Sequence, residues 1–167
     1  THHHHHIVPP ITSEYNHSSP FEPYLIHPFL SCCCFSENNN RLFALEPEAK
    51  RIFGFGKDLG PISEKLVKNP RFTKHAKYFI QMIDKALGML GPDIELLTEI
   101  LLELGAKHVS YGVKPEYFPS MGRALLFAVK DRLGDEYTDE VKDAWVEVYG
   151  ALSSDMIRGQ KNLESKE

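Results

Sequence analysis

Four segments of the chain repeat apolar side chains every three or four residues, which is the spacing of one face of an α-helix. Within these segments no stretch alternates with period two, so a sheet has no support. The pattern predicts an all-α protein from Asn69 to Arg158. The four stripes are Phe72, His75, Phe79, Ile83, Ala86 and Leu90, then Leu97, Leu101, Leu104 and His108, then Phe118, Gly122, Leu125 and Val129, and finally Val141, Trp145, Val148 and Leu152.

Residues that commonly begin and end helices flank each stripe. Asparagine, aspartate and threonine can cap free amide groups, proline suits the first helical position, and glycine suits the end. Two shorter apolar segments, 42–45 and 49–55, predict brief helical turns around a corner. The predicted starts are Asn69-Pro70, Asp93, Lys114-Pro115-Glu116 and Thr138, and the predicted ends of the first three helices are Gly91-Pro92, Tyr111-Gly112 and Leu133-Gly134.

Composition limits the classes of function. The chain has 167 residues, of which 42% are hydrophobic and 25% charged, enough for one sizeable core. Its net charge of −4 and pI of about 6.1 offer no basic surface for nucleic acid. The sequence contains no run long enough for a membrane span and no secretory signal pattern. We therefore expect a soluble, cytoplasmic protein.

The first forty residues differ from the rest. They contain no lysine or arginine, five prolines, all three cysteines and seven of the nine histidines. The run His2–His6 resembles a purification tag. We expect residues 1–40 to be an irregular, proline-rich segment and residues 41–167 to form the folded domain. The adjacent Cys32, Cys33 and Cys34 lack the spacing of a zinc site, and either reduced thiols or a lipidated or redox-sensitive cluster fits them.

His75 and His108 occupy apolar slots of the first two stripes, so both imidazoles are expected to point inward. A buried neutral imidazole needs a partner, and in an apolar pocket a metal, including the iron of haem, is the commonest strong one. A lone histidine on an apolar face is, however, more often a satisfied core residue. The residues around them are needed to choose between the two readings.

Two long runs resemble the globin family. Leu104 to Phe118 and Leu133 to Tyr149 are similar to the last three helices of a globin, and Leu42 to Pro47 with Phe53 is similar to the corner before them. The likeness covers about residues 41–158 and is greatest to neuroglobins and other small single-domain animal globins. The spacings of 22 residues from Phe53 to His75 and 33 from His75 to His108 also match that family.

The resemblance implies a three-over-three globin fold that binds haem b. His108 would be the proximal iron ligand, and His75 would either donate to bound dioxygen or take the sixth position. Phe53 would stack against the porphyrin, Tyr78 or Lys107 would reach a propionate, and Tyr149 would lie near the haem edge, although a solvated helix face also fits Tyr78 and Lys107. The other wall residues would be Phe55, Phe72, Phe79, Leu104, Val113, Phe118 and Met121.

The sequence also departs from the family. Residues 1–40 resemble neither the A helix nor most of the B helix, which are absent or replaced. Asn39 falls where globins commonly place a large aromatic over the ligand, which would open the distal pocket. Phe79 stands where valine is frequent, which would narrow it.

Three functions follow from these observations. The first is a haem protein that reversibly binds dioxygen, nitric oxide or carbon monoxide. The second is an enzyme of the same fold, a nitric oxide dioxygenase or nitrite reductase, or an electron-transfer protein. Either would need an external reductase. The third is a helical sensor or interaction module without haem.

Overall fold

The structure is a computed structural model, and it describes residues 41–54 and 69–166. Within these ranges every regular element is helical and no strand occurs, which confirms the predicted all-α class. The elements are a helical segment at 41–45, the 3-10 helix η2 (Pro47–Phe53), α3 (Pro70–Met89), α4 (Ile94–Ser110), α5 (Tyr117–Leu133), the 3-10 turn η3 (Gly134–Glu136) and α6 (Asp139–Glu164).

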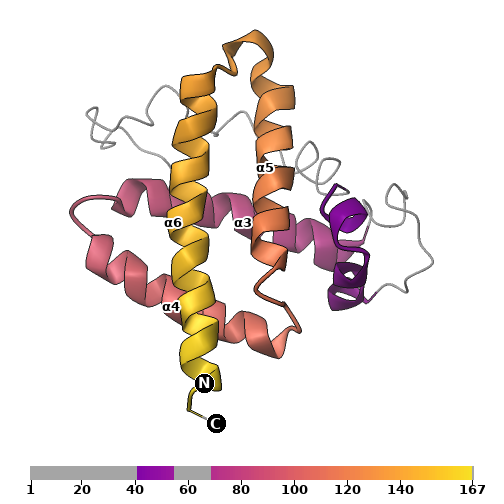
Figure 1. The fold of residues 1–167 in the computed structure, drawn as a ribbon, viewed down its shortest axis with the longest axis vertical. Helices are drawn as coiled ribbons and strands as arrows, with labels where there is room; N and C mark the ends of the chain where they lie inside the picture. Colours follow the sequence, from indigo (N-terminus) through magenta and orange to yellow (C-terminus); the bar gives the residue numbers. More distant parts are fainter. Residues whose placement is uncertain (1–40, 55–68, 167) are drawn as a thin grey trace.

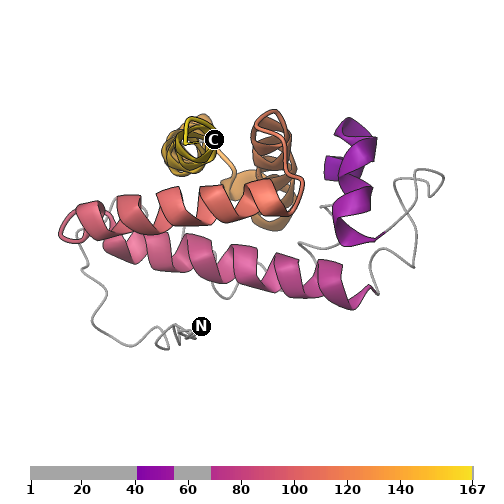
Figure 2. The same ribbon diagram turned by 90° about the horizontal axis from the view of Figure 1, so that it is seen from below.

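The long helices form two antiparallel pairs that cross each other. α3 and α4 run in opposite directions, and α5 and α6 lie across them (Figure 1). Seen from below, α4 lies between α3 and the end-on α6, while residues 41–54 stand beside α5 above the start of α3 (Figure 2). The interior between the two pairs is therefore enclosed by helices that are far apart in the sequence.

The predicted caps of two helices are confirmed. The side chain of Asn69 accepts a hydrogen bond from the Phe72 amide at 3.0 Å, and Pro70 occupies the first position of α3. Thr138 accepts from the Val141 amide at 3.3 Å at the start of α6. Each cap satisfies an amide that has no partner within its own helix.

Two predicted helix boundaries shift by a few residues. α5 begins at Tyr117 rather than at Pro115, because Tyr117 and Phe118 first donate their amides to Lys114 and Pro115 in tight turns. α6 continues past Arg158 to Glu164. None of the helices in residues 41–54 and 69–166 is long and apolar enough to cross a membrane.

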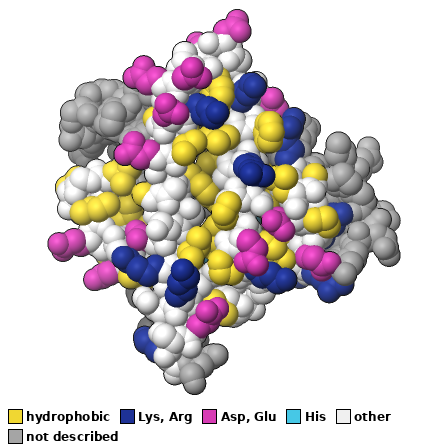
Figure 3. All heavy atoms as spheres, viewed as in Figure 1, with side chains coloured by type: hydrophobic (Ala, Val, Ile, Leu, Met, Phe, Trp, Pro, Cys, Tyr) yellow, Lys and Arg dark blue, Asp and Glu magenta, His cyan; other side chains and the backbone are white. Residues whose placement is uncertain are grey.

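The core follows the predicted stripes closely. Trp145, Val141, Leu125 and Leu97 are fully buried, and Phe72 is only 1% exposed. On the face in Figure 3, acidic and basic side chains are intermixed, and no histidine among the coloured residues is visible. The two described histidines therefore belong to the interior or to another face.

α4 and α6 approach each other until their backbones touch, and two glycines permit it. A Cβ atom at Gly105 would overlap the main chain of Met156. A Cβ atom at Gly159 would overlap the main chain of Leu102. This reciprocal contact fixes the position of α4, the helix that carries His108, relative to α6.

Candidate functional site

A large apolar cavity lies at the crossing of the helix pairs. Its volume is about 300 Å³, in the range of small-molecule and cofactor sites. Residues 42–53, α3, α4, α5 and α6 all contribute to its walls. Both described histidines line it, His75 from α3 and His108 from α4. The stripes predicted that both imidazoles point inward, and the fold places both of them at this one cavity.

His108 has one ring nitrogen engaged by its own helix. Its Nδ1 lies 2.7 Å from the carbonyl oxygen of Leu104, to which the neutral ring donates. Nε2 is then the nitrogen with a free lone pair. Burial lowers the pKa of His108, and the bond to Leu104 opposes that shift only in part. The ring is therefore neutral at neutral pH, with a defined tautomer.

Hydrogen bonds from α4 itself and from α6 hold the turn after His108. The amides of Gly112 and Val113 donate back to the carbonyls of Val109 and His108 at 3.0 and 3.1 Å, with Gly112 at a φ of 83°. This is the left-handed helix ending that glycine favours. The side chain of Gln160, only 1% exposed, donates its amide to the Val113 carbonyl at 2.9 Å. α6 thereby holds the end of α4.

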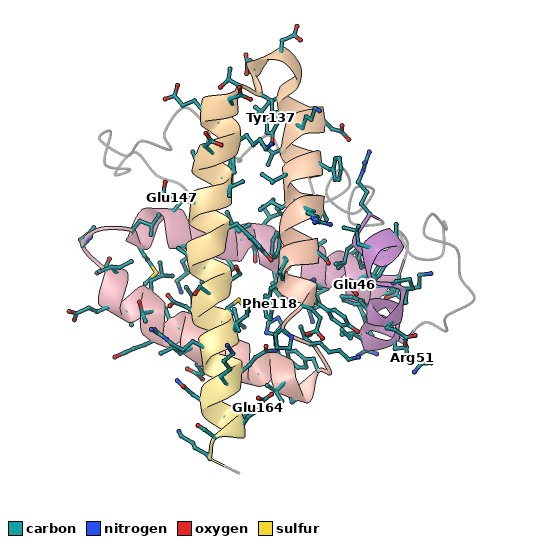
Figure 4. The ribbon with its side chains drawn as sticks, in the orientation of Figure 1. Glu46, Arg51, Phe118, Tyr137, Glu147 and Glu164 are labelled. Atoms are coloured by element: carbon teal, nitrogen blue, oxygen red, sulfur yellow. The ribbon has the colours of Figure 1, made fainter. Side chains whose placement is uncertain are left out.

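Aromatic rings surround His108. The Tyr111 ring packs edge-on, with its centroid 5.4 Å from that of the imidazole. The ring of Phe118, at the start of α5, has its centroid 6.1 Å from that of the imidazole. Figure 4 shows Phe118 at the lower end of α5, toward α6. The Tyr149 hydroxyl donates to the Phe118 carbonyl, and burial raises the pKa of that hydroxyl above its ordinary range. Tyr149 therefore presents a neutral ring to the cavity.

His75 is held by ring contacts. Phe53 packs edge-on at 5.4 Å between centroids, and Phe79 lies at 6.5 Å with a small interplanar angle. Burial, and then the charge of His108, lower the pKa of His75 to about 4. Among the described residues no hydrogen bond to either ring nitrogen is found. His75 is therefore a neutral donor whose ring nitrogens have no partner in this part of the chain.

Most of the sequence-predicted wall residues come together at the cavity. Phe53, Tyr78, Phe79, Leu104, Val113, Phe118, Met121 and Tyr149 all line it, with Tyr78 more than half exposed. Two do not reach it. Phe72 lies behind Phe53, where its ring packs against Phe43 at 5.3 Å. Lys107 points to solvent and pairs with Glu103 at 3.6 Å. Phe55 and Asn39 fall outside the described residues.

Sequence reasoning missed several walls of the cavity. Leu152, Ser153 and Met156 of α6 line it, as does Leu42 from the first helical segment. Leu152 belongs to a predicted core stripe, but a stripe does not tell which buried residues border a cavity. Met156 reaches the cavity because Gly105 allows α6 to approach α4 so closely, and neither residue alone signals that contact.

The donor set consists of two imidazoles rather than the cluster of ligands that holds a bare ion. In the described ranges no group of three or more histidine, cysteine or acidic side chains could hold a metal ion. Two neutral imidazoles in an apolar cavity instead offer one nitrogen each, from two successive helices. The class defined by this fold and site is an all-α bundle that encloses a ligand cavity between histidines.

Comparison with known proteins identifies the family. A family model described as Globin matches residues 37–156, and this chain belongs to the globin family. It is 36% identical over 128 residues to the neuroglobin of Tetraodon nigroviridis, covering 76% of this chain and 79% of that protein. It is 35% identical over 127 residues to the neuroglobin of Danio rerio, covering 75% and 79%.

A solved structure agrees on the fold. A hexacoordinated heme protein from an anhydrobiotic tardigrade matches with a TM-score of 0.69 over 82% of this chain and 86% of that one. The sequence identity is 22%, so the likeness concerns the fold alone. The predicted globin fold is confirmed.

Proposed function

We propose that this chain binds haem b in the cavity between α3 and α4, with His108 as proximal ligand, and that it reversibly binds dioxygen or another diatomic gas. The observation that carries the proposal is the placement of His75 and His108 in one apolar cavity. Nε2 of His108 is available, since Nδ1 is committed to Leu104. Haem, when bound, supplies an iron atom that takes gases reversibly in its ferrous form.

The residues of this chain would perform three tasks. The Leu104 carbonyl fixes the tautomer and plane of the His108 ring, which raises the basicity of its free nitrogen. The apolar walls would keep water out of the cavity, which would slow oxidation of the iron of a bound haem. His75 holds a neutral imidazole on the α3 side, where it can donate a hydrogen bond to a bound gas or occupy the sixth position itself.

Hemin titration tests this proposal. We expect the purified protein to take up one equivalent of hemin and to give a Soret band with the resolved visible bands of imidazole ligation. Reduction and addition of carbon monoxide should then shift the Soret band. A protein that retains no hemin after unbound hemin is removed would refute the proposal and favour a helical module without haem.

A second candidate function is a globin enzyme or electron-transfer protein. The ring nitrogens of His75, which have no hydrogen-bond partner among residues 41–54 and 69–166, favour it, because coordination of both imidazoles suits electron transfer better than storage. The chain would then need an external reductase. Nitric oxide consumption with a reductase supplied distinguishes the two functions, since sustained turnover identifies an enzyme and a single stoichiometric reaction identifies a carrier. A cytoplasmic location belongs to either version of the proposal.

A further inference from the structure

One hydrogen bond joins two side chains that are 74 positions apart in the sequence. The Ser120 hydroxyl donates to Glu46 Oε1 at 2.9 Å. Ser120, near the start of α5, is only 8% exposed. Figure 4 shows Glu46 in the segment that stands beside the lower half of α5. The bond therefore attaches this segment to a long helix of the bundle.

Glu46 is well placed to control the segment that follows it. Its amide donates to the Leu42 carbonyl at 2.7 Å, and its carbonyl accepts from the Ala49 amide at 3.0 Å. It is also the residue before Pro47, the first residue of η2. The main chain of Glu46 is therefore bonded both to the helical segment before it and to η2 after it.

η2 ends at Phe53, which touches His75. The Phe53 ring packs edge-on against the imidazole at 5.4 Å. Phe43 and Phe72 support it from behind, with centroids 5.8 and 5.4 Å from that of Phe53. A continuous set of contacts thus runs from Ser120 through η2 to the imidazole on α3.

The same end of α5 also reaches the other histidine. Phe118, two residues before Ser120, lies 6.1 Å from the His108 ring. Its carbonyl is held by the Tyr149 hydroxyl. The start of α5 therefore contacts His108 directly. It is linked to His75 indirectly, through Glu46 and η2, so the positions of both imidazoles depend on the same end of α5.

We propose that Glu46 and Ser120 are positioning residues for His75. Their hydrogen bond holds η2, and with it Phe53, against the imidazole, and so limits how far the ring can turn in the cavity. The inference rests on the proposed function for its effect on gas binding. The effect on the geometry of His75 does not depend on it.

Two pairs of variants test the inference. Ser120→Ala removes the donor and Ser120→Thr retains it, while Glu46→Ala removes the acceptor and Glu46→Gln retains a neutral one. The first readout is the NMR shifts of the His75 imidazole in the ferrous carbonmonoxy protein, assigned by comparison with His75→Leu. Because Phe53 exerts a ring current on His75, the two alanine variants should shift these signals and leave those of His108 in place.

The second readout is the rate of gas binding after rapid mixing with carbon monoxide. If His75 occupies the sixth position, its departure limits this rate, and the alanine variants should accelerate it by about two- to tenfold, the effect of losing one net hydrogen bond. Ser120→Thr should restore the original rate, and Glu46→Gln should give an intermediate one. If His75 instead donates to a bound gas, dioxygen dissociation should accelerate by the same factor.

A matched control removes an exposed hydroxyl that, among the described residues, donates only within its own turn. Ser165 donates to the Asn162 carbonyl at 3.0 Å, so Ser165→Ala should change neither readout. Circular dichroism of each variant shows whether the helices are intact. Unchanged His75 signals and unchanged rates in both alanine variants, or equal changes in Ser165→Ala, would overturn the inference. If the protein takes up no hemin, the proposed function fails, and the His75 signals of the protein as purified still decide the inference.

Discussion

Nδ1 of His108 lies 2.7 Å from the carbonyl oxygen of Leu104, one turn earlier on α4. This bond leaves Nε2 as the only ring nitrogen available to the cavity. It also holds the imidazole plane relative to the helix axis. Because α4 is itself fixed by its contact with α6, the donor atom has a set position in the bundle.

Replacing His108 with alanine should abolish tight haem binding. The variant loses the nitrogen donor, and mutations of the partners around a metal ligand already lower affinity by 10- to 100-fold, so we expect a loss of more than about 100-fold here. Hemin titration followed by absorption spectroscopy measures it. Lys107→Ala is the matched control, since its side chain is exposed and, among the described residues, pairs with Glu103. Retention of an unchanged spectrum in His108→Ala would show that another residue is the axial ligand.

His75→Leu should keep the haem and change its chemistry. Leucine retains apolar contacts with Phe53 and Phe79 but offers no nitrogen and no hydrogen-bond donor. The spectrum of the reduced, gas-free protein should become purely five-coordinate, and dioxygen should dissociate faster. Lys77→Leu, an exposed change on the same helix, should alter neither property. A spectrum of His75→Leu that matches the wild type would exclude His75 from the sixth position.

The sequence predicts the helices and the inward direction of the two histidines well, because both depend on local periodicity. Stripes identify the buried face, and Asn69 and Thr138 mark helix starts through bonds to residues three positions away. The bond between Glu46 and Ser120 and the bond between Gln160 and Val113 could not be predicted in this way, since their partners are 74 and 47 positions apart. Phe72 has the correct period for a wall residue, yet Phe53 lies between it and the cavity, and only the packing determines that order.

Acid should destabilise the haem-free protein. Burial, and then the charge of His108, lower the pKa of His75 from 6.5 to about 4, so between these pH values the unfolded chain binds a proton there that the folded protein does not. The contribution of His75 to the free energy of unfolding is therefore fully present above about pH 6.5. It is lost as the pH drops toward 4, and the loss is roughly 3 kcal/mol. The lowered pKa of His108 acts in the same direction.

Urea unfolding at a series of pH values measures this dependence. His75→Leu serves as the control, because it removes one titrating group and should flatten the curve between pH 6.5 and 4. An equally steep curve in that variant would mean that other groups cause the acid sensitivity.

Alanine at Gly105 or Gly159 should destabilise the protein and weaken haem binding together. An added methyl group at either position overlaps the main chain of the opposite helix, so α4 and α6 must separate, at a cost of about 1–3 kcal/mol. That separation displaces His108, which lies three residues after Gly105 on the same helix.

Gly150→Ala is the matched control on α6, because a Cβ atom there meets nothing within 4 Å. It should stabilise the protein by about 0.5–1 kcal/mol through the better helix propensity of alanine. Thermal unfolding and hemin titration of all three variants check the prediction, and equal effects at the three glycines would show that the close helix crossing does not determine the position of His108.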